Sequence, residues 1–256
     1  MELLPLCALA FLAGFVDSIV GGGGLIQLPA LFIFLPPGLA ASTASVLGTN
    51  KFSAFCGTGF AALRYARAVQ INWASILPTG VAAFAFSALG ARVVSHLAAE
   101  LVRPLLFILL LVVAVYTVWR KDFGSLHAPR LTARAEQMAG IVIGMALGFY
   151  DGFFGPGTGS FLMFLFIGLF GFDFLNASAS TKVVNAATNL AALLYFAWAG
   201  HIFVEYAVPM GLCNVLGALL GTRLAILKGN RLVRGFFLVV VGVMLLRFGW
   251  EMWAGR

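Results

Sequence analysis

The sequence predicts an all-α polytopic membrane protein, because charged residues are scarce, apolar segments are long and the chain repeats internally. Of its 256 residues, 62% are hydrophobic and 10% are charged, and the mean hydropathy is +1.02. Soluble domains carry roughly 25% charged residues. Several windows of about 20 residues hold at most one charge, as expected for helices that cross a hydrocarbon core about 30 Å thick. A water-soluble globule is therefore excluded.

The apolar segments number ten and fall into two groups of five. They lie near 3–20, 24–36, 40–66, 72–95, 101–119, 136–154, 158–171, 174–199, 204–227 and 231–252. The most polar stretch lies between the two groups and carries several basic residues. We therefore predict a first transmembrane repeat at 1–120, a cytoplasmic linker at 121–135 and a second transmembrane repeat at 136–256.

The two groups are related in sequence. Residues 14–24 (GFVDSIVGGGG) match residues 148–159 (GFYDGFFGPGTG), which aligns Asp17 with Asp151. Further along, Lys51 aligns with Lys182 at an offset of 131, and pairs of Pro, Gly and Arg follow at the same offset. Internal repeats of this kind are typical of secondary transporters.

The repeats are expected to have opposite membrane orientations. Five segments are an odd number, so the second repeat enters the bilayer from the side opposite to the first. Loop charge agrees with this inversion. The loop that holds Arg64 and Arg67 is basic, and its counterpart at 200–203 has no Lys or Arg. The positive-inside rule then places the linker in the cytoplasm and both termini outside, and it explains the net charge of +7 without a nucleic-acid partner.

Glycine-rich interruptions mark the first candidate for a binding site. They are 21-GGGG-24 and 155-GPGTG-159. Such stretches end one helix and begin another, so 24–36 and 158–171 are expected to be half-helices, either re-entrant or spanning. The N-terminus of a half-helix favours an anion, which makes Gly23, Gly24, Gly157 and Gly159 candidate binding residues. Close helix packing is the alternative role for these glycines.

Two lysines near the middle of apolar segments are the second candidate. An ionisable group at that depth costs several kcal/mol unless it is paired or faces water. Lys182 shares a helix face with Asn185 and Asn189, and Lys51 follows a stripe of Ser and Thr residues. Snorkelling to the headgroups is the alternative. The candidate substrate-binding side chains are Lys51, Lys182, Asn50, Thr49, Thr181, Asn185 and Asn189.

Asp17 and Asp151 stand just before the glycines and are candidates for coupling. They could neutralise the lysines when substrate is absent, accept a coupling proton, or cap the following half-helix. No cofactor or metal site is expected, because His96, His127 and His201 fall in or near loops and no metal-binding motif occurs.

With these residues assembled, the sequence resembles the TauE/SafE permease family, the sulfite exporters. The resemblance rests on 14-GFVDSIVGGGGLIQLPAL-31, 148-GFYDGFFGPGTGSFL-162, 48-GTNKF-52 and 178-SASTKVVNAATNLAAL-193. It implies a multi-pass protein of the cell inner membrane that transports a small, sulfur-containing oxyanion or organosulfonate. Apart from the resemblance, the two aspartates make protons the candidate coupling ion. An anion channel, a small-carboxylate permease and an intramembrane Ser/Lys enzyme remain as alternatives.

Overall fold

The computed structural model describes residues 2–40, 42–95 and 131–253, and within these ranges the chain forms helices and no strand. The first half contains α1 (Leu3–Val20), α2 (Gly24–Phe34), α3 (Pro37–Ala40), α4 (Thr43–Ala68) and α5 (Trp73–Val94). The second half contains α7 (Ala133–Phe153), α8 (Thr158–Leu165), the π-helix η2 (Phe166–Phe170), α9 (Phe174–Trp198) and α10 (Val204–Trp253). The expected apolar segments therefore form helices within a few residues of their predicted ends. The segment at 101–119 and most of the linker lie outside the described residues.

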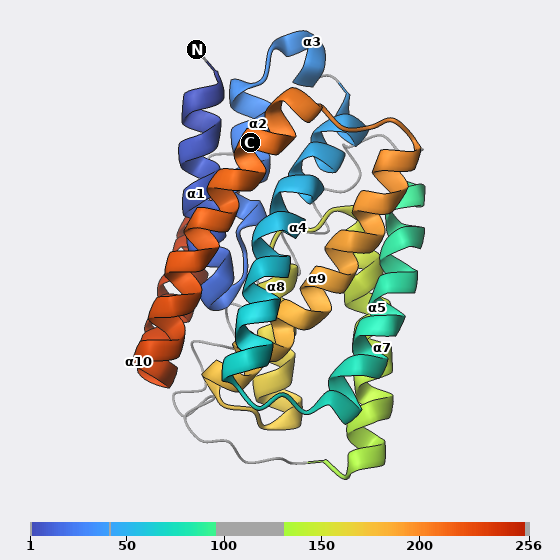
Figure 1. Ribbon diagram of the computed structural model, residues 1–256, viewed down its shortest axis with the longest axis vertical. Coiled ribbons are helices and arrows are strands. Elements are labelled where there is room, and N and C mark those ends of the chain that lie inside the picture. Colours follow the sequence, from blue (N-terminus) through green and yellow to red (C-terminus); the bar gives the residue numbers. More distant parts are fainter. Residues whose placement is uncertain (1, 41, 96–130, 254–256) are drawn as a thin grey trace.

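The last helix contains the break that the sequence predicts between 204–227 and 231–252. Gly229 has φ of 63° and ψ of −154°, a backbone conformation that ends the helical path. In Figure 1, α10 descends from the upper end of the molecule and then turns back.

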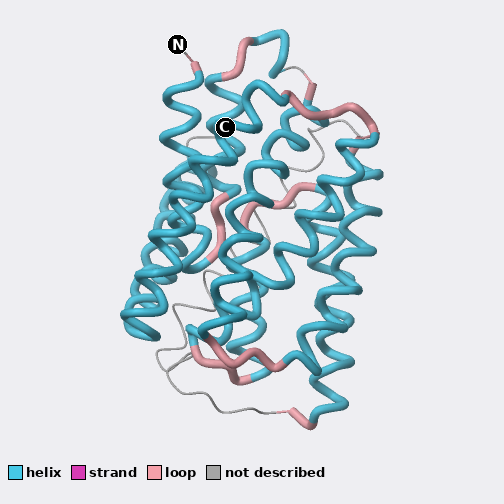
Figure 2. The backbone as a smooth tube through the Cα atoms, viewed as in Figure 1, coloured by secondary structure: helices cyan, strands magenta, loops and turns pink. Residues whose placement is uncertain are grey.

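The helices of the two halves run in opposite directions. In Figure 1, α1 and α4 run downward and α5 runs upward, whereas α7 and α9 run upward and the first part of α10 runs downward. Each half begins with a helical hairpin, in which α2 turns back along α1 and α8 turns back along α7. The 11 residues of α2 span about 16 Å, too short to cross a bilayer core. The loops of both hairpins therefore lie inside the bundle, at about half its height (Figure 2).

Packing between the halves dominates the bundle. Helix α5 lies along α7, α1 lies along the first part of α10, and α4 crosses α9. On α7, a glycine recurs at every fourth position, and each of them lies against α5: Gly140, Gly144, Gly148 and Gly152. A Cβ atom at Gly152 would overlap the carbonyl oxygen of Ser87. Such stripes of small residues allow close backbone contact between helices in a membrane, where dispersion provides much of the attraction.

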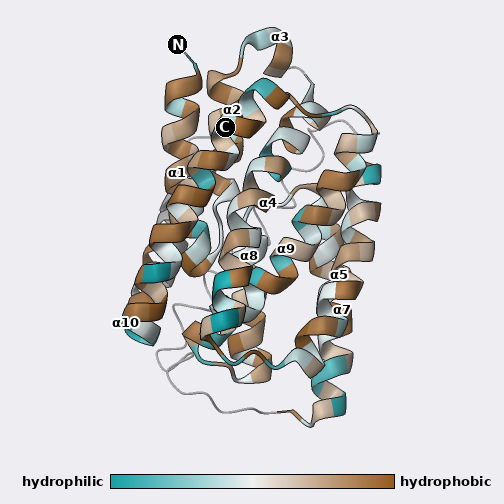
Figure 3. Cartoon of the chain, in the orientation of Figure 1, coloured by the Kyte–Doolittle hydropathy of each residue, from teal (hydrophilic) through white to brown (hydrophobic). Residues whose placement is uncertain are grey.

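The distribution of polarity is that of a membrane protein. Large apolar side chains are exposed on the outer helices, whereas many Ser, Thr and Asn side chains are buried. Figure 3 shows the apolar colouring over the outer faces of α1, α7 and α10. Among the described residues, α1, α5 and Val204–Phe236 are each long and apolar enough to cross a membrane. Helices α4 and α9 are longer than α1 and α5, but their buried faces carry the polar residues of the centre.

Candidate substrate site

The centre of the molecule is formed where the two hairpin loops meet. Gly21, Gly155 and Gly157 have φ values of 83°, 98° and 86°, which L side chains rarely adopt. A Cβ atom on Gly21 would lie 2.5 Å from the carbonyl carbon of Gly159, so the two loops touch through their backbones. The glycines therefore allow both the turns and the contact between the loops.

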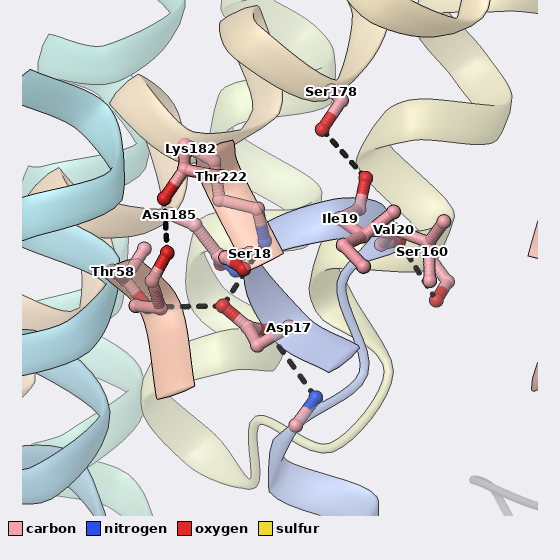
Figure 4. A network of polar contacts seen from close by, with 12 residues as sticks. Asp17, Ser18, Ile19, Val20, Thr58, Ser160, Ser178, Lys182, Asn185 and Thr222 are labelled. Carbon is pink, nitrogen blue, oxygen red and sulfur yellow. Dashed lines mark hydrogen bonds and ion pairs between the residues drawn. The ribbon is translucent and has the colours of Figure 1, made fainter. Parts of the chain in front are cut away.

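Side chains of α4, α8 and α9 satisfy the backbone where α1 ends. The last carbonyl groups of a helix have no partner within it and need one when water is absent. Ser178 Oγ donates to Ile19 O at 2.7 Å and Ser160 Oγ donates to Val20 O at 3.4 Å, and both contacts are visible in Figure 4. Tyr65 of α4 donates to Ser18 O at 2.9 Å. These contacts hold the end of α1 inside the bundle.

The first of two buried ion pairs joins Lys51 of α4 to Asp151 of α7. Lys51 Nζ lies 2.8 Å from Asp151 Oδ2, and the two side chains are 2% and 4% exposed. Lys51 Nζ also donates to Asn189 Oδ1 at 3.1 Å. Its ammonium group lies against Gly155, where a Cβ atom would come within 2.9 Å of Nζ.

The second ion pair joins Lys182 of α9 to Asp17 of α1. Lys182 Nζ lies 3.0 Å from Asp17 Oδ2. The same carboxylate accepts from Thr58 Oγ1 at 3.1 Å and from the backbone N–H of Gly23 at 3.2 Å, so it also caps the start of α2 (Figure 4). The sequence offers neutralisation and capping as alternative roles for Asp17, and in the structure Asp17 has both.

Both ion pairs cross between the halves. Each half supplies one aspartate from the last turn of its first helix and one lysine from its long inner helix. Each lysine contacts the aspartate of the other half. A buried charge is tolerated only when it is paired, so the two halves neutralise each other.

A small cavity opens beside the first pair. Its volume is about 30 Å³, enough for roughly two water molecules. Glycines from both loops line it together with Asp17, Asp151, Lys51 and Thr58. The remaining polar lining consists of side-chain amides, from Gln27, Asn50, Asn185, Asn189 and Asn214.

Two of these amides have an oxygen atom without a hydrogen-bond partner among the described residues. The side chains of Asn50 and Asn185 are 3% and 5% exposed, and within the described part of the chain their Oδ1 atoms have no hydrogen-bond partner. Buried polar groups without partners are rare and call for an explanation. Asn189, by contrast, accepts from Lys51, and Asn214 Nδ2 donates to Gln27 Oε1 at 2.8 Å. The Oδ1 atoms of Asn50 and Asn185 are therefore free to accept a hydrogen bond from a ligand or water in the cavity.

The structure brings most of the residues predicted from sequence to this cavity. Lys51, Asn50, Asn185, Asn189, Gly23, Gly24, Gly157, Gly159, Asp17 and Asp151 all line it. Lys182 is fully buried behind Asp17 and does not line it. Thr49 accepts instead from the backbone N–H of Phe203 at 2.9 Å, and Thr181 is buried away from the cavity.

Three polar residues of the lining were not predicted from sequence. Gln27 and Asn214 are single amides in otherwise apolar segments. A polar side chain in such a segment indicates a functional site, and this argument applies to an amide as well as to a lysine. Thr58 lies seven residues after Lys51 and so on the same helix face. No group of three or more His, Cys, Asp or Glu that could hold a metal ion occurs in the described ranges.

A membrane-embedded helical bundle with interrupted helices and a buried, charged cavity at its centre has the architecture of a membrane transporter. The sequence matches the family Sulfite exporter TauE/SafE over residues 6–248, and the chain belongs to that family.

Its relatives are named as membrane transporters, not enzymes. A probable membrane transporter protein of Sinorhizobium sp, ORF9, is 36% identical, with 93% of this chain and 88% of the relative covered. One of Haemophilus influenzae is 33% identical over 96% and 94% of the two chains. The Escherichia coli K12 protein YfcA is 34% identical over 92% and 85%. No solved structure matches the chain.

Proposed function

We propose that this transporter carries a small anion, either a sulfur-containing oxyanion or an organosulfonate, which binds in the central cavity. The observation that carries the proposal is the buried Lys51 ammonium group in a cavity that the asparagine amides and the starts of two helices also line. The ammonium group donates charge-assisted hydrogen bonds of the kind that hold a compact oxyanion, whereas the free Oδ1 atoms of Asn50 and Asn185 accept hydrogen bonds and suit water that enters with the anion. The starts of α2 and α8 add the positive ends of their helix dipoles, because Gly24 and Gly157 also line the cavity.

The cavity as it stands is smaller than such an anion, so binding requires the hairpin loops to separate. Alternating access supplies that movement, with the two halves rocking about the central site. The opposite helix directions of the halves support inverted repeats, and the basic residues at the end of α4 and the start of α7 lie at one end of the bundle. We assign that end to the cytoplasm and the protein to the inner membrane.

Purified protein should bind one member of a panel comprising sulfite, sulfonates, thiosulfate and short carboxylates. Counterflow and saturation in liposomes are expected of a carrier, whereas conductance would indicate a channel. If the protein binds a short carboxylate more tightly than every sulfur oxyanion, the alternative of a small-carboxylate permease is correct. Failure of every anion to bind would reject the proposal.

Inverted topology predicts the sides from which single cysteines can be labelled. In a variant without Cys7, Cys56 and Cys213, cysteines at 64–72 and 120–135 should react with an impermeant reagent from one side of the membrane. A cysteine at 200–203 should react from the other side. Labelling of 200–203 from the side of 120–135 would contradict the inversion.

Protons are the proposed coupling ion, with Asp17 or Asp151 as the acceptor. Both carboxylates line the cavity and lie within 3.0 Å of a lysine. Asn keeps the size of the side chain and removes the charge. At least one of the variants Asp17→Asn and Asp151→Asn should lose the dependence of anion uptake on pH. If uptake by both variants follows the wild-type pH profile, the carboxylates act only as structural caps.

A further inference from the structure

The two ion pairs occupy corresponding positions in the halves, but their surroundings differ. Asp17 is held by three donors, from Lys182, Thr58 and the backbone of Gly23. Asp151 has a single polar partner among the described residues, Lys51, and the Lys51 ammonium group faces the cavity. The Asp17 pair is therefore fixed, whereas the Asp151 pair can open toward a ligand.

An anion that binds Lys51 must compete with the carboxylate already there. Lys51 has one ammonium group, and Asp151 Oδ2 and Asn189 Oδ1 both contact it. Once the anion takes its place, Asp151 is left as a buried carboxylate without a cation. Such a charge costs several kcal/mol and is instead removed by protonation. The anion and a proton are thus driven to bind together.

Among the described residues, the other charged groups near Asp151 do not offer a replacement cation. Helix α8 has no charged residue, and the charged residue of α5, Arg92, lies five residues beyond Ser87, the residue that meets α7 near Asp151. Lys182 of α9 is paired with Asp17, and Asp17 itself adds negative charge to the cavity. The neighbouring Tyr150 hydroxyl donates to Pro156 O at 2.7 Å. A proton from the entering water is the available positive charge.

We propose that anion binding at Lys51 and protonation of Asp151 are linked, so that one proton is bound with each anion while the Lys182–Asp17 pair stays closed. The step forms one O–H bond on Asp151, and the proton comes from water on the side from which the anion enters. This inference rests on the proposed anion transport and assigns its coupling to one of two carboxylates that the sequence treats as equivalent.

Proton linkage is measured best with anions whose own charge is constant from mildly acidic to mildly alkaline pH. Methanesulfonate and thiosulfate serve as such probes. Because the bound state holds one more proton, wild-type affinity should rise as pH falls, by up to about tenfold per pH unit. A pH-sensitive dye in weak buffer should report uptake of about one proton per bound anion.

Asp151→Asn separates this inference from the proposed function. It leaves Lys51 without a carboxylate, so the probe should bind more tightly than to the wild type, with no dependence on pH and no proton uptake. Asp17→Asn is the matched comparison and should keep the pH dependence, although it weakens the fixed pair. A pH dependence that persists in Asp151→Asn, or disappears only in Asp17→Asn, would overturn the assignment and leave anion transport standing.

The stability of the same variant gives a second readout if Asp151→Asn folds poorly. At a given concentration, a ligand that binds the folded state stabilises it more the tighter it binds. The probe should therefore raise the melting temperature of Asp151→Asn more than that of the wild type. An equal rise in both proteins would contradict the inference, and no rise in any variant would reject the anion site itself.

Discussion

Replacing Lys51 by Met should weaken anion binding about tenfold to a hundredfold, or roughly 1.5–3 kcal/mol, the contribution of a charge-assisted hydrogen bond. Methionine keeps most of the stem of the side chain and removes the charge that faces the cavity. Its thioether would lie among Gly155, Asn189 and Asp151, where the ammonium group lies now. Binding of the identified anion to purified protein measures the effect.

Two companion variants sharpen this result. Lys51→Arg keeps the charge, but its guanidinium needs more room than the contact with Gly155 allows, so function should be lost. Each Met variant leaves one buried aspartate without its cation and should lower the yield of folded protein, but only Lys51→Met removes a charge that lines the cavity. If both Met variants insert normally and bind the anion with unchanged affinity, the lysines are structural and the site lies elsewhere.

Replacing Gly21 by Ala should greatly reduce the yield of folded protein. The new Cβ would lie 2.5 Å from a backbone carbon of Gly159, and backbone cannot move aside as a flexible side chain can. With φ of 83° and ψ of 177°, Gly21 has a backbone conformation found essentially only in glycine, which adds a cost of about 1–3 kcal/mol for an L side chain. Together with overpacking of about 1–3 kcal/mol, this exceeds what a marginally stable protein tolerates.

Matched glycines separate the two causes of that loss. Gly159→Ala tests the same contact, because its Cβ would lie 2.8 Å from Gly21 Cα, but the φ of Gly159 is not positive. It should be destabilised less than Gly21→Ala. Gly80→Ala is the control, since no atom lies within 4 Å of a Cβ there. Thermal unfolding in detergent orders the three variants, and a Gly21→Ala protein as stable as Gly80→Ala would show that the loops are not in contact.

The sequence allows the helices to be predicted because their apolar segments are long and are punctuated by glycine. It also identifies the charged centre, since Lys51, Lys182, Asp17 and Asp151 are exceptional in such segments. Pairing cannot be predicted in the same way. Each carboxylate contacts the lysine of the other half, and this depends on how α4 crosses α9.

Roles that depend on the direction in which a side chain points could not be predicted from the sequence either. Thr49 belongs to the same polar stripe as its neighbours, yet it bonds to the loop before α10 and not to the cavity. Lys182 is as deep in its helix as Lys51, but it contacts Asp17 and does not line the cavity. Gln27 and Asn214 enter the site because α2 and α10 meet there, a contact between segments 187 residues apart.

The crossed ion pairs have a consequence for how such a protein could be divided. A half chain would contain one acid and one base, but the geometry that pairs them requires a second half. In the membrane, one half alone would therefore leave its buried charges unpaired, whereas two separate halves that associate would pair them. A shorter ancestor with this motif would have satisfied its charges only by associating with a second copy in the opposite orientation. Joining the two copies in one chain then makes that association independent of concentration.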